Sequence, residues 1–431
     1  MQPQRTNISF QLEVPIEFGE KLFVWANLHQ NVIWLDSNNY PQKYTIFDKA
    51  LALGVASELS CDYNDAFDQL DQYQQQTNDY LFGYLGYDLK NDVEALESNN
   101  HDGLEFPDLY FFQPKKLFFI KDNRVTFLYL DAYKNDVNSD FESILKTNKP
   151  VKTLSPKTEI KQRISEAAYY KKLKQVKEHI IKGDSYEINF CMEYYAENTK
   201  INPLQVYQNL NAISTPPFAT FFKNKNQYVL SATPERFVRK EGQKVISQPI
   251  KGTAKRSADK KEDKQLALAL SKDEKERSEN IMIVDLVRND LSKTATKNSV
   301  EVEELCKVYT FKQVHQLIST VVSEVKPNIS PVQLIKTLFP MGSMTGAPKI
   351  STMKIIENLE ETKRGVYSGT VGYFTPKGDF DFNVIIRSIL YNKTKKYVSY
   401  SVGGAITAKS DPRKEYQECL LKASAMKRVL E

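Results

Sequence analysis

Two pairs of glutamates are the residues whose type and spacing most directly suggest chemistry. Glu276 and Glu279 lie three residues apart, and so do Glu415 and Glu418. On a helix this spacing puts both carboxylates of a pair on one face. Two such faces could together hold Mg²⁺, which prefers oxygen ligands. Acidic pairs of this kind also lie on solvated helix surfaces, so the spacing alone leaves both interpretations open.

A single lysine is the second candidate. Lys251 lies in the string QPIKGT, residues 248–253, where proline and glycine predict a tight, fixed backbone around the amine. A lysine attacks carbon only as the neutral amine, which requires a desolvated or cationic setting. An ordinary surface loop would also carry such a lysine, and the string by itself does not distinguish the two.

The elements that must position these residues can be predicted from the sequence. Ser165 and Gly183 bound a helix over 165–182 as its cap and its stop. Further helices are predicted over 264–287, 331–338, 348–359 and 412–430. Strands are predicted over 31–35, 116–120, 124–130, 186–190, 228–231, 382–390 and 397–402. Long helices mixed with many non-repeating strands indicate an α+β fold.

The chain divides by composition into two regions. Residues 1–150 have short strands and turns and are expected to form a β-rich N-terminal subdomain, and residues 160–431 a larger domain. A polar, basic and proline-containing stretch over about 146–162 is interpreted as the connector.

Bulk composition excludes several classes of protein. The chain has 431 residues, 41% hydrophobic and 26% charged, with a formal net charge of +5, as expected for a globular protein. It has no concentrated basic tract, which argues against nucleic acid as a partner. It has neither a signal peptide nor an apolar run of roughly 18 residues, which argues against a membrane protein. The four cysteines form no CxxC pair, so reduced thiols and a cytoplasmic location are expected.

The string around Lys251 is followed by four others in a particular order. They are ERSENIMIVDLVRND (276–290), FPMGSMTGAPK (339–349), YSGTVGY (367–373) and GGAI (403–406). From about residue 165 to the end, this ordered set resembles the chorismate-utilising enzymes. The resemblance implies an anthranilate-synthase-like fold, with two packed antiparallel sheets surrounded by helices. Lys251 resembles the mark of the branch that aminates chorismate at C4, since the anthranilate-forming branch usually has alanine there.

By this resemblance the acidic pairs form the metal site. The carboxylates matching Glu279 and Glu418 hold Mg²⁺, which bridges to the ring carboxylate of chorismate. Those matching Glu276 and Glu415 assist, partly through water. The domain over 160–431 is then the chorismate-binding catalytic domain.

The resemblance also implies a site for the enolpyruvyl carboxylate of chorismate. It assigns this group to Tyr367 and Arg387, and to the backbone N–H groups of Gly403 and Gly404. Arginine offers a planar fork that matches a carboxylate. Taken alone, Arg387 in its apolar strand pattern would more readily be a salt-bridged structural residue. The other residues assigned to substrate binding are Thr253, Ser343 and Lys422.

The implied reaction is an amination through a covalent intermediate. Lys251 adds to ring C2 while the 4-hydroxyl leaves, with Glu235 as general acid. Such an acid needs a raised pKa, which burial can supply. Ammonia then attacks C4 and expels the lysine, giving 4-amino-4-deoxychorismate, the precursor of 4-aminobenzoate and folate. His315 is placed near the reacting ring. The plainer alternatives are an ion pair of Glu235 with Arg236, and packing of His315 on a helix.

Two positions depart from the family pattern. Glu187 stands where the isochorismate- and salicylate-forming branches carry a lysine that activates water, so that base is missing here. The ammonia-using branches more often carry glutamine there. Ala405 stands where a third glycine is common. Neither departure removes a proposed reacting group.

The source of ammonia and the regulation of the chain are further expectations. A glutaminase of the expected class needs a nucleophilic cysteine flanked by glycine, and none of the four cysteines has a glycine neighbour. A separate glutamine amidotransferase subunit is therefore expected as the partner. In the N-terminal region the family can hold a regulatory tryptophan pocket, for which Ser37 is a candidate, although plain packing is favoured. The rival functions are anthranilate synthesis and a non-catalytic chorismate-binding subunit.

Overall fold

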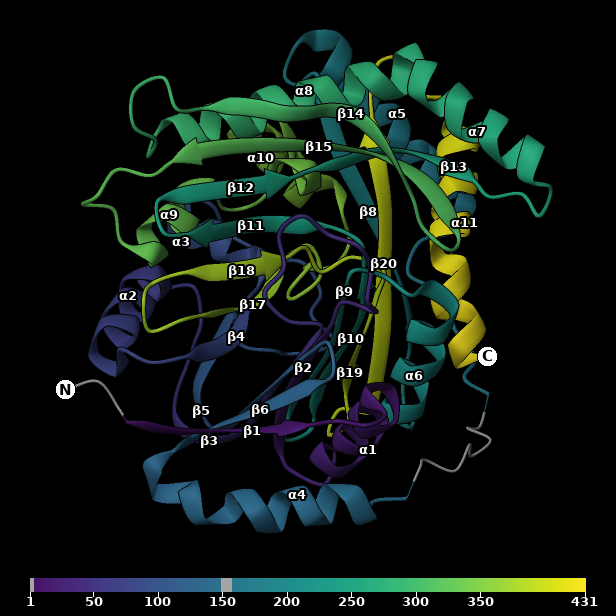
Figure 1. Cartoon of the computed structure of the whole chain (residues 1–431). Coiled ribbons are helices and arrows are strands. Elements are labelled where there is room, and N and C mark those ends of the chain that lie inside the picture. Colours follow the sequence, from purple (N-terminus) through teal and green to yellow (C-terminus); the bar gives the residue numbers. More distant parts are fainter. Residues whose placement is uncertain (1–3, 149–156) are drawn as a thin grey trace.

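The computed structural model describes residues 4–148 and 157–431 (Figure 1). Residues 149–156 of the predicted connector lie outside the described residues. The helices are α1 (Pro15–Ala26), α2 (Ala66–Thr77), α3 (Lys90–Val93), α4 (Val137–Lys146), α5 (Glu166–Lys182), α6 (Pro203–Ser214), α7 (Lys260–Lys272), α8 (Glu274–Ser292), α9 (Pro331–Leu338), α10 (Lys349–Leu359) and α11 (Pro412–Leu430). Within the described ranges, no helix combines the length and the apolar character needed to cross a membrane.

The strands outnumber the helices. They are β1 (Arg5–Gln11), β2 (Asn31–Asp36), β3 (Lys49–Cys61), β4 (Leu81–Leu85), β5 (Leu109–Lys121), β6 (Arg124–Leu130), β7 (Lys161–Gln162), β8 (Glu187–Ala196), β9 (Phe218–Asn224), β10 (Gln227–Thr233), β11 (Arg236–Glu241), β12 (Lys244–Gln248), β13 (Ile250–Lys255), β14 (Glu301–Thr310), β15 (Val314–Glu324), β16 (Gly346–Ala347), β17 (Thr370–Phe374), β18 (Phe380–Asn383), β19 (Ser388–Asn392) and β20 (Tyr397–Ile406).

The described strands pair antiparallel and form one hydrogen-bonded network of two halves. One half runs β14–β15–β12–β11–β18–β17–β4–β5, and the other runs β2–β9–β10–β19–β20–β8. The long strand β3 joins them, since it pairs with β5 along its length and with β2 at its start. Gly54 of β3 has φ 68°, beside a register shift between Val55 and Ser57. This left-handed backbone conformation favours glycine, and the irregularity bends β3 between the two halves of the sheet.

Two apolar cores hold the layers together. One lies between the halves of the sheet and joins Phe111 and Phe382 of the first half to Phe222 and Val229 of the second. The other lies between the second half and the helices α1, α5, α6 and α11. Figure 1 shows α11 beside β20, and α7 and α8 at the edge formed by β13 to β15. The α+β prediction, with packed antiparallel layers and outer helices, is confirmed.

The N-terminal region shares this sheet with the rest of the chain. Strand β2 pairs with β9, and β4 pairs with β17. The two regions are therefore joined in one hydrogen-bonded sheet, and the division near residue 150 stays a prediction.

Three local predictions need correction. The helix expected over 264–287 is two helices, because Asp273 leaves the helical region (ψ 112°) and its carboxylate accepts the backbone N–H of Glu276 to cap α8. The strand expected over 382–390 is interrupted between β18 and β19, where Arg387 has φ 52°. His315 lies on strand β15 instead of on a helix. The other predicted helices are confirmed within a residue at each end.

Candidate active site

One cavity of about 320 Å³ lies where β13, α8, β20 and α11 meet. Its volume is within the range of ligand pockets, about 300–1,000 Å³. Thirteen of the residues predicted for the site line it: Glu235, Lys251, Thr253, Glu276, Glu279, Ser343, Tyr367, Arg387, Gly403, Gly404, Glu415, Glu418 and Lys422. His315 does not line it. The structure thus brings together all five sequence strings around one space.

A backbone irregularity aims Lys251 into this cavity. Gly252 has φ 85°, and the pairing of β13 with β15 shifts register between Lys251 and Thr253. A Cβ at Gly252 would also lie 3.2 Å from the Glu276 side chain. Glycine therefore meets two needs here, a left-handed backbone and a close approach of β13 to α8.

The partner of Lys251 is an acid. Its Nζ donates a hydrogen bond to Oε1 of Glu187 at 2.8 Å, and Glu187 is fully buried. Burial by itself would lower the pKa of Lys251, but the neighbouring carboxylates, Glu187 foremost, raise it above its ordinary value. The setting is desolvated as expected, yet in this pair the lysine is an ammonium at rest.

Glu235 has the environment of a general acid. It lies between β10 and β11, is 4% exposed, and accepts a hydrogen bond from the Ser343 hydroxyl at 2.7 Å. Burial raises its pKa to about 7. Its sequence neighbour Arg236 pairs instead with Asp381, at 2.9 Å. The simple alternative, an ion pair between Glu235 and Arg236, is therefore wrong.

Helices α8 and α11 each turn an acidic pair into the cavity. Burial raises the pKa of Glu276 and Glu415, and it raises the pKa of Glu279 to about 7. The pKa of Glu418 is lowered, chiefly by the ammonium of Lys422, which lies 2.7 Å away. The four carboxylates thus crowd a partly desolvated space that favours the arrival of a cation.

Lys275, which the sequence motifs do not predict for the site, lies between the two acidic pairs. Lys275 Nζ is 3.6 Å from Oε1 of Glu279 and 3.7 Å from Oε1 of Glu415. That oxygen of Glu279 is buried and receives no hydrogen bond among the described residues. In residues 4–148 and 157–431, no three acidic, histidine or cysteine side chains converge into a complete metal site. The residues nevertheless suit Mg²⁺, which commonly takes one or two protein carboxylates and completes its shell with water and substrate oxygens.

The part of the cavity around Arg387 is suited to an anion. Burial lowers the pKa of Arg387, and no hydrogen bond or ion pair reaches its guanidinium from the part of the chain that the structure describes. Arg387 is partly buried, and a partly buried guanidinium without a partner is less stable than one that binds an anion. Tyr367 lines the same space. A Cβ at Gly404 would lie 3.4 Å from Oε2 of Glu415, so a side chain there would crowd the acidic cluster.

His315 and its neighbour Gln316 face opposite sides of β15. The two ring nitrogens of His315 lie 2.9 Å from the Thr310 hydroxyl and 3.0 Å from Asp263, away from the cavity. Gln316 pairs in register with Thr253 and lines the cavity, and its buried Oε1 has no hydrogen-bond partner among the described residues. On a strand, successive side chains point to opposite faces, so a strand at this place would have predicted that Gln316 faces the cavity. The helix expected around His315 does not make that prediction. The role proposed for His315 stays a prediction.

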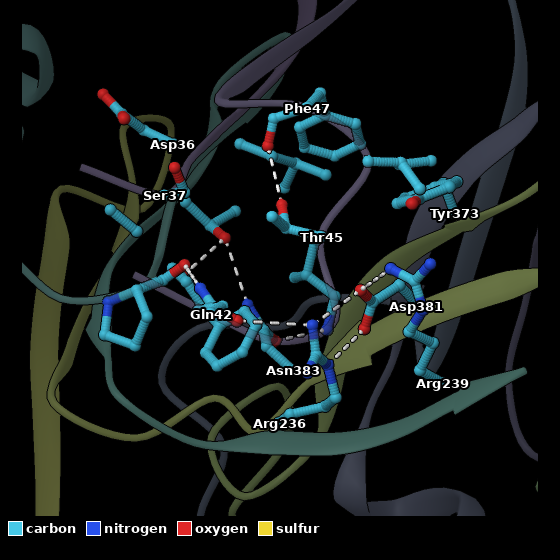
Figure 2. A pocket seen from close by; sticks show the side chains of 17 residues that line it. Asp36, Ser37, Gln42, Thr45, Phe47, Arg236, Arg239, Tyr373, Asp381 and Asn383 are labelled. Atoms are coloured by element: carbon cyan, nitrogen blue, oxygen red, sulfur yellow. Dashed lines mark hydrogen bonds and ion pairs between the residues drawn. The ribbon is translucent and has the colours of Figure 1, made fainter. Parts of the chain in front are cut away.

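Ser37 lines a second, smaller cavity, whose walls come from residues 35–47 and from residues 217–383. Figure 2 shows Ser37, Thr45 and Phe47 on one side and Arg236 on the other, where Arg236 pairs with Asp381. The cavity has about 50 Å³ of free volume, well below the roughly 300 Å³ of the smallest usual ligand pockets. A tryptophan or other regulatory ligand at this place stays a prediction.

Comparisons with known proteins agree with this geometry. A family model described as chorismate binding enzyme matches residues 30–428. Aminodeoxychorismate synthase component 1 of Bacillus subtilis is 32% identical over 362 residues, covering 81% of this chain and 76% of that protein. Aminodeoxychorismate synthase of Streptomyces griseus is 42% identical over 284 residues, covering 65% of this chain but only 38% of that longer protein. Among solved structures, anthranilate synthase component I from Streptococcus pneumoniae superposes with a TM-score of 0.76 at 25% identity, covering 90% of this chain and 95% of that one.

Proposed function

The chain belongs to the family of chorismate binding enzymes, and on that premise we propose that it aminates chorismate at C4 with ammonia. The product is 4-amino-4-deoxychorismate, the precursor of 4-aminobenzoate and folate. The observation that carries the proposal is the amine of Lys251, which enters a cavity that Glu235 also lines. The name of the Bacillus subtilis relative supports the same reaction.

Lys251 is proposed as the nucleophile of the reaction and Glu235 as its general acid. The neutral amine of Lys251 adds to ring C2, the two conjugated ring double bonds shift, and the C4–O bond breaks. Glu235 gives its proton to the leaving hydroxyl, which departs as water. Because the pKa of Glu235 is about 7, a large fraction is protonated at neutral pH. Ammonia then forms the new bond at C4 while the C2–N bond breaks and releases Lys251.

Mg²⁺ is proposed as the cofactor. Glu279 and Glu418 would hold it, and Glu276 and Glu415 would assist, since all four line the cavity. When bound, the ion neutralises the ring carboxylate of chorismate and fixes its position. Oε1 of Glu279, which is buried and receives no hydrogen bond among the described residues, supports a cation at this place.

The enolpyruvyl carboxylate of chorismate is proposed to bind at Arg387. The unpaired guanidinium of Arg387 supplies a planar fork, and Tyr367 lies beside it in the cavity. A side chain at Gly403 would clash with β8, and one at Gly404 would lie against Glu415 and Lys422. The backbone N–H groups of these two glycines are proposed as further contacts to the substrate. Thr253, Ser343 and Lys422 are proposed as further contacts to the substrate.

The ammonia is proposed to come from a separate glutamine amidotransferase subunit, with the reaction in the cytoplasm. The word "component" in the name of the Bacillus subtilis relative supports a partner. Free ammonia at alkaline pH should replace that partner in vitro.

The test is product analysis. The purified chain is incubated with chorismate, Mg²⁺ and an ammonium salt, and products are resolved by mass. We expect 4-amino-4-deoxychorismate, which a lyase converts to 4-aminobenzoate, and its loss by at least about 100-fold in Lys251→Ala at limiting ammonia. Lys244→Ala, which removes an exposed lysine on the neighbouring strand β12, is the matched control. Anthranilate as the product would refute the proposed branch, and saturable binding without turnover would indicate a non-catalytic subunit.

A further inference from the structure

Glu187 holds an unusual position at the start of β8. Its side chain is fully buried, and its Oε1 lies 2.8 Å from Nζ of Lys251. Its other oxygen, Oε2, is also buried and receives no hydrogen bond from any described residue. The backbone around it is held firmly, because Ser185 donates its hydroxyl hydrogen bond to the Glu187 carbonyl and Ala347 pairs with it in register. A carboxylate is therefore fixed against the amine that must react.

We propose that Glu187 is the proton acceptor that converts Lys251 from a resting ammonium into the attacking amine. This inference rests on the proposed function. The N–H bond of Lys251 breaks and an O–H bond forms on Oε1 of Glu187, along the existing hydrogen bond. The freed lone pair then adds to C2 of chorismate. When ammonia later displaces Lys251, the lysine leaves as a neutral amine. It then takes the proton back from Glu187, so the pair is restored without any other reagent.

The surroundings of the pair favour this transfer. Burial penalises both charges, so a neutral amine beside a neutral acid competes with the ion pair in a dry site. The buried Oε2 receives no hydrogen bond from a described residue, so the carboxylate anion lacks one of its usual stabilising contacts. The other charged groups facing Lys251 are Glu279 from α8, Glu235 before β11 and Glu418 from α11.

Only Glu187 offers the lysine a direct path for its proton. Within the part of the chain that the structure describes, no other side chain forms a hydrogen bond with Nζ of Lys251. The shared proton remains inside the protein, so its transfer does not depend on the pH of the solvent. Without an acid at residue 187, Lys251 has to lose its proton to the solvent before it can attack.

The substitution Glu187→Gln tests this directly, because glutamine keeps the hydrogen-bond acceptor but cannot take a proton. Single-turnover consumption of chorismate is measured for the variant and the unmodified enzyme from about pH 6 to about pH 9, at a constant concentration of free ammonia. The ratio of the two rates cancels the titration of Glu235, and saturating Mg²⁺ keeps Glu279, whose pKa Glu187 helps to raise, ionised in both proteins. We expect this ratio to rise about tenfold per pH unit until Lys251 of the variant is deprotonated.

Two further variants sharpen the result. Glu193→Gln, on the same strand, removes another buried carboxylate, which pairs with Arg163 at 2.9 Å, and should leave the ratio independent of pH. Glu187→Asp keeps an acid and should also give a ratio independent of pH, although the rate is lower.

Two outcomes would overturn the inference. A Glu187→Gln ratio that stays near one at all pH values would show that Glu187 does not accept the proton. A ratio that is low but constant would show that the pair only holds Lys251 in place. Failure of the proposed function is distinguishable, because the unmodified enzyme would then make no 4-amino-4-deoxychorismate.

Discussion

The hydrogen bond from Ser343 to Glu235 should set the upper pH limit of the reaction. The acid must be protonated to expel the hydroxyl, so the rate is full well below its pKa and falls as the pH rises through about 7. Burial raises that pKa, and the Ser343 hydroxyl, 2.7 Å away, opposes the rise by stabilising the anion. Removing the hydroxyl in Ser343→Ala should therefore move the limit upward.

The size of the shift follows from the strength of the bond. A hydrogen bond to a charged group contributes about 1.5–3 kcal/mol, and one pKa unit corresponds to about 1.4 kcal/mol. The pKa of Glu235 in Ser343→Ala should thus rise by about one to two units. At pH 8 a one-unit rise takes the protonated fraction from roughly a tenth to roughly a half, so kcat should increase about fivefold.

The assay is the pH dependence of kcat at saturating chorismate and ammonia. Glu235→Gln serves as the control, since it should lower kcat by about 100-fold or more and remove the alkaline limb. Adding Ser343→Ala to Glu235→Gln should then leave the pH profile unchanged. An alkaline limb that stays in place in Ser343→Ala, or moves to lower pH, would refute the reasoning.

Three other predictions follow from the same site. Binding of Mg²⁺ measured by calorimetry should weaken as the pH falls through about 7, because protons compete for Glu279, and an affinity independent of pH would contradict this. Lys275→Met should increase the affinity for Mg²⁺ several-fold, since it removes the ammonium between Glu279 and Glu415. This magnitude corresponds to about 1 kcal/mol or less for a partly exposed ion pair. Weaker binding of Mg²⁺ by the variant would mean that Lys275 assists the metal. Folding raises the pKa of Glu235 from 4.5 to about 7. Ionised Glu235 therefore destabilises the folded state increasingly as the pH rises from about 4.5 to above 7. At the upper end of this range the loss of stability is on the order of 3 kcal/mol. Glu235→Gln should accordingly be more stable to urea at pH 8 but not at about pH 4.5, and equal gains at both would refute the burial argument.

The sequence determined the features that depend on near neighbours along the chain. The helix α5 begins after Ser165, whose hydroxyl accepts the Ala168 N–H, and ends at Gly183 in a left-handed conformation. The helix α11 matches its predicted range, so Glu415 and Glu418 share a face as expected. Caps and helical periodicity act over three or four residues, which is why they can be predicted without tertiary contacts. The resemblance between motifs then indicated which of these faces meet at the active site.

Tertiary structure decided the features that depend on residues far apart in the sequence. Lys251 meets Glu187 across 64 positions, and among the neighbouring carboxylates Glu187 is the foremost cause of the raised pKa of the lysine, against the effect of burial. Arg236 takes Asp381 as its partner instead of Glu235, because the pairing of β11 with β18 sets which charges lie side by side. The charge state of a buried group is set by whatever packing places within a few ångströms of it, and the order of residues along the chain does not contain that information.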